Sequence, residues 1–180
     1  MRHLSLYEKF GKEEDDKILY LHGLDSSPWK DRVDILKSTG AFVVAPQFNY
    51  REQIVWKQLE ELHKENHFDA VVGHSLGGYL AYYFSNYFKI PALMFMPAFG
   101  SRKSDIDELQ PLPKEVMNAL PYKDQMAVVG MKDDVVHPKV QIRFLERTNA
   151  EIFREPNEGH RFAPSLFQKY VDKFYNKQYF

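Results

Sequence analysis

Short runs of apolar residues alternate along the chain with longer segments in which apolar residues recur every three or four positions. The short runs are rich in Val, Ile, Leu, Phe, Met and Ala, which is typical of strands that are buried on both faces of a parallel sheet. One run is more polar than the others, which indicates an edge strand. We expect six strands, at residues 17–22, 41–45, 69–73, 92–96, 126–130 and, at the edge, 151–154.

The longer segments have the spacing of helices with one apolar face. Ser27 and Pro28 predict an N-cap and a first-turn proline for one helix, and Asn49 with Glu52 fits a capping box for the next. Pro138 has the position of a first-turn proline as well. Further helices are expected over residues 76–86, 114–120 and 167–174. This alternation predicts an α/β fold, with a doubly wound, mostly parallel six-stranded sheet and helices on both faces.

Residues 98–124 break the alternation of strands and helices. Three prolines, Pro111, Pro113 and Pro121, interrupt a polar and charged stretch there. We expect this segment to be a short excursion over one end of the sheet, within a single domain that covers residues 1–180. A chain of 180 residues, 44% of them hydrophobic and 27% charged, has the size and composition of one globular domain.

The charge balance narrows the expected partners. With 24 Lys and Arg against 25 Asp and Glu, the formal net charge is −1, and no basic run has the density of a phosphate-binding stripe. We therefore expect no nucleic-acid partner. No apolar run approaches the roughly 18 residues that span a bilayer, so we expect no membrane contact and a cytoplasmic location. The oligomeric state stays open.

A serine in the middle of the chain is the candidate nucleophile. The chain has no cysteine, so covalent chemistry needs another residue. Residues 73–77 read Gly-His-Ser-Leu-Gly, a GxSxG pattern between an expected strand and an expected helix. Gly73 and Gly77 provide the neighbours without side chains that such a strained turn needs, and the helix N-terminus favours an oxyanion beside Ser75. The alternative is an ordinary Gly/Ser turn.

A serine hydroxyl needs a base to take its proton, and the chain has seven histidines. His160 follows the last expected strand, so its loop lies at the carboxyl edge of the sheet, where Ser75 also emerges. We therefore expect His160 to be the base. The other histidines are expected to support the turns (His22, His74), to cap a helix or line the pocket (His137), or to lie in solvent (His3, His63, His67).

The base in turn needs a carboxylate that orients the imidazole and stabilises its charged form. Asp133 and Asp134 follow the strand at 126–130, at the same edge of the sheet as Ser75 and His160. Either aspartate can reach the histidine by this reasoning. The set implies no metal ion and no cofactor.

Four segments, in this order along the chain, resemble the α/β-hydrolases. They are Leu-His-Gly-Leu at 21–24, Gly-His-Ser-Leu-Gly-Gly at 73–78, Gly-Met-Lys-Asp-Asp-Val-Val-His-Pro at 130–138 and Glu-Gly-His-Arg-Phe at 158–162. The resemblance covers nearly the whole chain and points to a compact bacterial esterase branch. It implies the strand order 2-1-3-4-5-6, without the first antiparallel strands of larger members, and a minimal lid at residues 98–124.

The resemblance also implies a choice of acid and a reaction. In the family pattern the acid lies three residues after a glycine, which falls on Asp133 after Gly130 and leaves Asp134 as the alternative. The implied reaction is hydrolysis of small soluble carboxylic esters through an acyl-serine intermediate on Ser75, with His160 as base. A thioesterase or an amidase would use the same residues, and a non-catalytic small-molecule receptor is the alternative of another class.

By the same resemblance, His22 and Gly23 belong to an oxyanion loop, with the backbone N–H groups of Leu24 and Leu76 as donors. Residues 98–124, the implied cover of the site, are mostly polar. Each buried CH₂ contributes about 0.8 kcal/mol, so a long acyl chain would need a continuous apolar trench. We therefore expect short acyl groups, of roughly two to six carbons by this burial argument.

Overall fold

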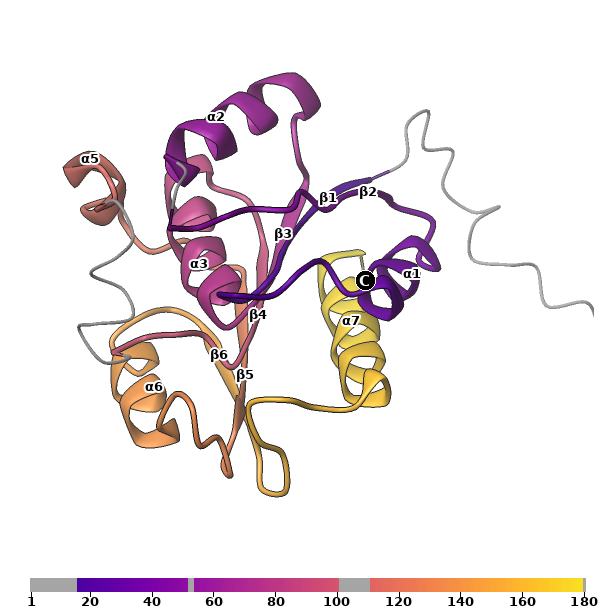
Figure 1. Cartoon of the computed structure of the whole chain (residues 1–180), viewed down its shortest axis with the longest axis vertical. Helices are drawn as coiled ribbons and strands as arrows, with labels where there is room; N and C mark the ends of the chain where they lie inside the picture. Colours follow the sequence, from indigo (N-terminus) through magenta and orange to yellow (C-terminus); the bar gives the residue numbers. More distant parts are fainter. Residues whose placement is uncertain (1–15, 52–53, 101–110, 180) are drawn as a thin grey trace, which may run out of the picture.

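The structure is a computed structural model that describes residues 16–51, 54–100 and 111–179. Its centre is a six-stranded sheet in the order β2-β1-β3-β4-β5-β6, in which every neighbouring pair is parallel (Figure 1). The predicted strand order and the predicted edge position of the last strand are both confirmed. The strands are β1 (Lys17–Leu21), β2 (Phe42–Val44), β3 (Ala70–His74), β4 (Ala92–Phe95), β5 (Gln125–Gly130) and β6 (Glu151–Glu155).

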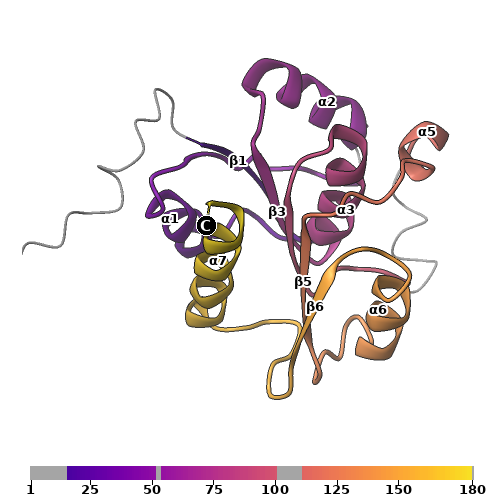
Figure 2. The same ribbon diagram turned by 180° about the vertical axis from the view of Figure 1, so that it is seen from behind.

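Helices cover both faces of this sheet, as predicted. One face of the sheet is covered by α1 (Lys30–Lys37) and α7 (Pro164–Tyr179), whose buried side chains pack into the same core cluster. The other face carries α2 (Val55–Asn66), α3 (Leu76–Phe88) and α6 (Pro138–Leu145), and Figure 2 shows the same layers from behind. None of the helices in these described ranges is long and apolar enough to cross a membrane.

The alternation of side chains along each strand divides the core into two layers. On β3, Val71 packs into the cluster beneath α2 and α3, while Val72 packs into the cluster beneath α1 and α7. Both side chains are fully buried. Because all six strands are parallel, the loops after β1, β3, β5 and β6 all emerge at one edge of the sheet.

Two predicted helix starts are wrong. Helix α1 begins at Lys30 after Trp29, whose backbone is extended at φ −68° and ψ 127°, so Ser27 and Pro28 precede the helix. Trp29 packs its ring against His74 instead, with 5.4 Å between ring centroids.

Helix α2 begins at Val55, too far from Asn49 for a capping box, and its N-cap has no side-chain hydrogen bond. Glu52, the other member of that box, lies outside the described residues.

Residues 98–124 are described only in part, because residues 101–110 lie outside the described ranges. Helix α5 (Lys114–Met117) is shorter than the predicted 114–120 and packs against α3, with Val116 buried. The Leu120 carbonyl accepts a hydrogen bond from Lys89 Nζ at 2.8 Å, and Lys89 is the C-cap of α3. Leu120 therefore lies at the C-terminal end of α3, whereas Ser75 precedes its N-terminal end. This end of the segment does not lie over Ser75, so a cover over the site stays a prediction.

Candidate active site

Ser75 lies on a sharp turn between β3 and α3. Its backbone has φ 56° and ψ −118°, a conformation that non-glycine residues rarely adopt. Backbone hydrogen bonds hold it there: Ser75 N–H donates to the Phe95 carbonyl at 2.9 Å, and the Ser75 carbonyl accepts from Tyr79 and Ala98 N–H groups, each at 3.0 Å. The strained turn is thus determined by its neighbours on β4 and α3.

Glycines allow the backbones around Ser75 to approach closely, as the sequence predicts. A Cβ atom on Gly73 would lie 2.2 Å from the Gly77 carbonyl oxygen. A Cβ atom on Gly77 would lie 2.1 Å from the Leu21 carbonyl oxygen. Both distances are far below any real contact with backbone, so no side chain fits at either position. The glycines let α3 begin directly against the ends of β1 and β3.

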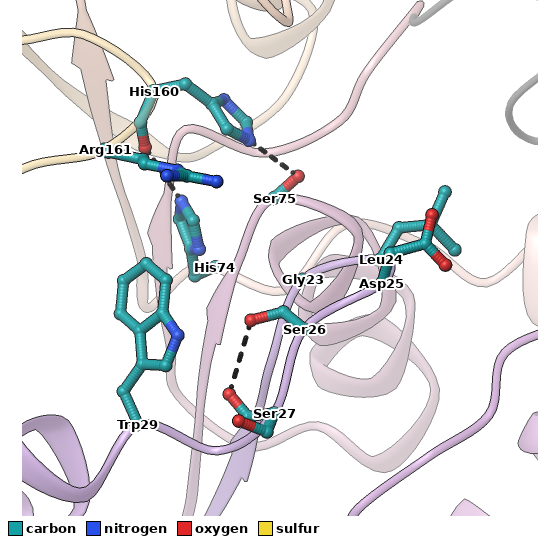
Figure 3. A pocket seen from close by; sticks show the side chains of 10 residues that line it. All are labelled: Gly23, Leu24, Asp25, Ser26, Ser27, Trp29, His74, Ser75, His160 and Arg161. Carbon is teal, nitrogen blue, oxygen red and sulfur yellow. Dashed lines mark hydrogen bonds between the residues drawn. The ribbon is translucent and has the colours of Figure 1, made fainter.

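Ser75, His160 and Asp133 form one hydrogen-bonded series. His160 Nε2 lies 3.0 Å from Ser75 Oγ (Figure 3). On the other side of the ring, His160 Nδ1 lies 2.9 Å from Asp133 Oδ2 and 3.1 Å from Asp133 Oδ1. The Asp133 side chain is fully buried and the His160 side chain is 12% exposed. The structure therefore brings together the three residues that the sequence singled out, with a base between hydroxyl and carboxylate.

The loops that carry Asp133 and His160 lie against each other. Lys132 N–H donates to the Glu158 carbonyl at 2.9 Å, and a Cβ atom on Gly130 would lie 2.6 Å from that same carbonyl oxygen. Gly130 is therefore needed for this close approach at the end of β5.

Asp133 rather than Asp134 faces the imidazole. Asp133 Oδ1 accepts hydrogen bonds from the N–H groups of Val135 at 3.0 Å and Val136 at 2.8 Å, whereas Asp134 is exposed. Burial by itself raises the pKa of the Asp133 carboxyl. The hydrogen bonds from His160 and from these backbone N–H groups outweigh burial, so the pKa lies below its ordinary value. The carboxylate is thus kept ionised beside His160.

Gln141 is a member of the site that the sequence did not reveal. It lies on α6, is fully buried, and donates from Nε2 to Asp133 Oδ2 at 3.0 Å and to the Val136 carbonyl at 2.6 Å. Both partners are acceptors, so the amide nitrogen must face them. The sequence offered one signal for it: Pro138 marks the start of α6, and Gln141 lies one turn later on the same face of that helix.

The loop after β1 brings His22 and Gly23 next to the nucleophile. Phe48 N–H donates to His22 Nε2 at 3.0 Å, so the ring proton sits on Nδ1, which donates to the Gly23 carbonyl at 2.7 Å. Burial lowers the pKa of His22 and keeps the ring neutral. A Cβ atom on Gly23 would lie 3.3 Å from Ser75 Cβ. This hydrogen bond holds the Gly23 carbonyl in place. Because the Gly23–Leu24 peptide is trans, the Leu24 N–H points away from that carbonyl, so the same bond also fixes the direction of the Leu24 N–H.

Leu76 supplies the other expected donor position. It is the first residue of α3, directly after Ser75, and the N–H groups of a first helical turn have no acceptor within the helix. Leu24 lines the same pocket as Ser75. Both expected oxyanion donors therefore adjoin the nucleophile.

His74 connects the nucleophile turn to the His160 loop. Its Nε2 lies 3.0 Å from the His160 carbonyl oxygen, and its ring packs against the rings of His160, Trp29 and Phe162. Burial, followed by the neighbouring charge of His160, lowers the pKa of His74 from 6.5 to about 4. His74 is therefore neutral at pH 7 and donates its Nε2 proton to that carbonyl, which is a supporting position.

The remaining histidines lie away from this series. His137 is the N-cap of α6 and accepts a hydrogen bond from Lys139 N–H at 3.2 Å, which confirms the expected capping position. His67 is exposed, as expected. His63 was expected in solvent, and that prediction is wrong: its ring packs 4.2 Å from the Phe88 ring, and burial lowers its pKa. His3 lies outside the described residues.

A pocket of about 510 Å³ opens beside Ser75 (Figure 3). Within the described ranges, no three His, Asp or Glu side chains are grouped so as to hold a metal ion. The pocket is formed by the loop after β1, the nucleophile turn and the His160 loop. Its lining residues are Gly23, Leu24, Asp25, Ser26, Ser27, Trp29, His74, Ser75, His160 and Arg161.

Comparison with known proteins identifies both a family and a fold. Residues 17–168 match the model of a family described as an uncharacterised protein family, UPF0227. Among solved structures, an esterase from Pyrococcus furiosus is 18% identical, with a TM-score of 0.70 over 92% of this chain and 82% of that chain. A monoacylglycerol lipase from Paleococcus ferrophilus is 14% identical, with a TM-score of 0.69 over 89% of this chain and 94% of that chain.

A Xanthomonas campestris protein assigned to the α/β-hydrolase superfamily is also similar. It is 18% identical, with a TM-score of 0.60 over 88% of this chain and 99% of that chain. At these identities the likeness establishes the fold. Together with the strand order β2-β1-β3-β4-β5-β6, it shows that the chain has the α/β-hydrolase fold.

Proposed function

The chain belongs to the uncharacterised protein family UPF0227, and we propose that it is a serine esterase that hydrolyses small soluble carboxylic esters through an acyl-serine intermediate. The observation that carries the proposal is the hydrogen-bonded series from Asp133 through His160 to Ser75 beside an open pocket. The fold that the chain shares with an esterase and a lipase supports hydrolysis as the reaction class.

In the first step, Ser75 Oγ attacks the ester carbonyl carbon and His160 Nε2 takes the hydroxyl proton. The 3.0 Å contact between these atoms is the length of a hydrogen bond that can transfer this proton. Asp133 accepts the Nδ1 proton of the imidazole in a hydrogen bond, fixes its tautomer and stabilises the imidazolium. Its depressed pKa supports this role, because the carboxylate stays ionised.

The negative charge that develops on the carbonyl oxygen is stabilised by the N–H groups of Leu24 and Leu76. One such donor typically contributes about 3–4 kcal/mol to transition-state stabilisation. The hydrogen bond from His22 to the Gly23 carbonyl supports this assignment, because it holds the peptide that carries the Leu24 N–H. The start of α3 adds the positive end of its helix dipole.

Collapse of the tetrahedral intermediate breaks the bond to the alcohol oxygen, which receives the proton from His160 Nε2. Water then attacks the acyl-serine and gives a proton to the same nitrogen. The second intermediate releases the carboxylic acid, and Ser75 Oγ takes the proton back. The cycle consumes one ester and one water, and it forms one acid and one alcohol.

The pocket supports short acyl groups. Leu24 and Trp29 are the large apolar side chains among its lining residues, and most of the others are polar. A long chain would gain about 0.8 kcal/mol for each CH₂ only where apolar surface covers it. Measuring kcat/KM along a series of p-nitrophenyl esters tests this: a maximum at roughly two to six acyl carbons is expected. A maximum at long chains would overturn the size assignment alone.

The reaction itself is tested with Ser75→Ala. This variant should fold normally, because it removes one oxygen atom, and its kcat on the best short ester should fall by about 10⁴-fold or more. Parallel assays with the matching thioester and amide separate esterase from thioesterase and amidase action. A Ser75→Ala protein with wild-type turnover would exclude the proposed nucleophile.

A further inference from the structure

The pocket beside Ser75 is more charged than a pocket for a plain alkyl ester needs to be. Asp25 and Arg161 both line it, and the hydroxyls of Ser26 and Ser27 lie between the apolar Leu24 and Trp29 along its wall. An uncharged acyl or alkoxy group would form no ion pair with either residue. The charges in the lining therefore indicate which charge the substrate carries.

The negative charge in the pocket is compensated from within the protein. Asp25 Oδ1 is paired with Arg51 Nη1, across the loops that follow β1 and β2. Both side chains are partly exposed, with 66% exposure for Asp25 and 39% for Arg51. Because its charge is already matched, Asp25 offers little attraction for a cationic substrate.

Arg161, the positive charge in the pocket, has no such partner among the residues that the structure describes. None of the ion pairs in the described part of the chain includes Arg161, which is exposed to solvent. Its backbone follows directly after His160, and Figure 3 shows its side chain beside those of His160 and His74 at the wall of the pocket. Arg161 thus lines the pocket in which a substrate bound to Ser75 would lie.

A second arginine adds positive potential behind the pocket wall. Arg32 is 2% exposed, and its guanidinium lies 5.4 Å from the Trp29 ring centroid and 4.7 Å from that of Phe162. Its Nη2 donates to the Phe162 carbonyl, while Nε and Nη1 have no hydrogen-bond partner in the described structure. Asp31 Oδ2 lies 3.6 Å from Arg32 Nη1, and the Asp31 side chain is half exposed, so it balances the buried charge of Arg32 only in part.

We infer that the pocket binds a carboxylate carried by the substrate, with Arg161 as the ion-pair partner, so that the preferred substrates are short anionic esters. This inference rests on the proposed function of Ser75. A carboxylate fits better than a phosphoryl group, because one guanidinium in the lining matches one negative charge in a bidentate pair. The Ser27 hydroxyl is a further donor on the same wall, whereas the Ser26 hydroxyl donates to the Ser27 carbonyl at 3.4 Å.

The expected selectivity is moderate, because Arg161 is exposed to water. A charge-assisted pair at such a site favours the charged ligand by about fivefold to tenfold, and salt weakens it. The carboxylate can sit on the acyl part or on the alcohol part of the ester. Two pairs of substrates separate these cases: monoethyl glutarate against ethyl glutaramate, and O-acetylglycolate against O-acetylglycolamide.

The experiment measures kcat/KM for both pairs with the wild-type protein, Arg161→Gln and Arg147→Gln. Arg147 is an exposed arginine in the turn after α6, at the opposite edge of the sheet, and serves as the matched control. In the wild type and in Arg147→Gln, the carboxylate member of at least one pair should be preferred by about fivefold or more. In Arg161→Gln this ratio should fall to about one, and added salt of about 1 M should reduce it in the wild type.

A wild-type ratio of one or less in both pairs, or a ratio that Arg161→Gln leaves unchanged, would overturn the inference while leaving the esterase intact. Glutarate binding to Ser75→Ala, followed by NMR chemical shifts, tests the carboxylate site without turnover. Glutarate should shift signals of the pocket in this variant and bind several-fold more weakly when Arg161→Gln is added. Absence of hydrolysis with every ester would count against the proposed function, and glutarate binding would still decide the carboxylate site.

Discussion

The two halves of the candidate active site are built in different ways. The nucleophile turn, residues 73–78, is held by close backbone contacts that leave no room for a Cβ atom at Gly73 or Gly77. The acid–base loops, residues 130–137 and 156–161, touch through the backbone at Gly130 and at the hydrogen bond from Lys132 N–H to the Glu158 carbonyl, and side-chain hydrogen bonds position Asp133 and His160 within them. The nucleophile turn therefore depends on the absence of side chains at two glycines, whereas the positions of Asp133 and His160 depend on polar side chains that contact them.

This contrast determines which changes each half tolerates. Added volume at the nucleophile turn must displace β1 or α3, so it acts on folding first. Removal of a polar group from the acid–base loops leaves the backbone in place and acts on chemistry first. Variants in each half, taken in decreasing order of the change they should produce, test that division.

Asp133→Asn should disable the chemistry of the acid–base loops without unfolding the protein. An amide cannot balance the imidazolium and can hold the wrong tautomer of His160, so kcat should fall by about 10⁴-fold. Asp134→Asn is the matched control, because Asp134 is exposed, and its kcat should stay within about twofold of wild type. The reverse ranking of the two variants in steady-state kinetics would transfer the acid to Asp134.

Gly77→Ala should disrupt the nucleophile turn at the level of folding. Its new methyl group would meet the Leu21 carbonyl oxygen at 2.1 Å and the His22 carbonyl oxygen at 2.6 Å, both of which are backbone atoms. We expect a loss of about 3 kcal/mol or more in the free energy of unfolding, measured with urea. Gly159→Ala is the control in the other half, because its methyl group would meet nothing closer than 3.4 Å. Equal stability of the two variants would refute the division.

Acid should loosen the contact between the two halves through His74. Its pKa is about 4 in the folded protein, below the ordinary histidine value of 6.5 that applies in the unfolded chain, so protonation favours unfolding. Its neutral form stabilises the fold fully above pH 6.5, and about 3 kcal/mol is lost as the pH falls from 6.5 towards 4. Urea unfolding between pH 7 and 4 should show a shallower decline for His74→Asn than for wild type. Parallel curves would contradict this assignment.

Gln141→Leu should have the smallest effect, and it tests how Asp133 is positioned within the acid–base loops. The change keeps similar volume but leaves Asp133 Oδ2 without the Gln141 donor, so kcat should fall by about tenfold while KM changes little. Gln168→Leu on α7, which breaks a hydrogen bond to Asp172, is the control and should leave kcat unchanged. If both variants lost kcat equally, Gln141 would have no positioning role.

The same division explains what the sequence could reveal. The strands, the GxSxG turn and the positions of Ser75 and His160 follow from apolar periodicity and from glycines that backbone contacts demand, whereas the strand order followed from the resemblance to the α/β-hydrolases. Gln141 was missed because a glutamine on a helix gives no sign of whether it is buried or exposed. The start of α1 was misjudged because Trp29 packs against His74, a contact between segments that are far apart in sequence and that overrides a local capping preference.

The most direct test of Ser75 as an activated nucleophile is the position of covalent labelling by a fluorophosphonate probe. The probe should add once to the wild-type protein, and peptide mass spectrometry should find the adduct on Ser75. Labelling should be lost in Ser75→Ala and strongly slowed in His160→Ala, because the base no longer activates the hydroxyl. An adduct on another residue, or a folded wild-type protein that acquires no adduct, would contradict the assignment of Ser75.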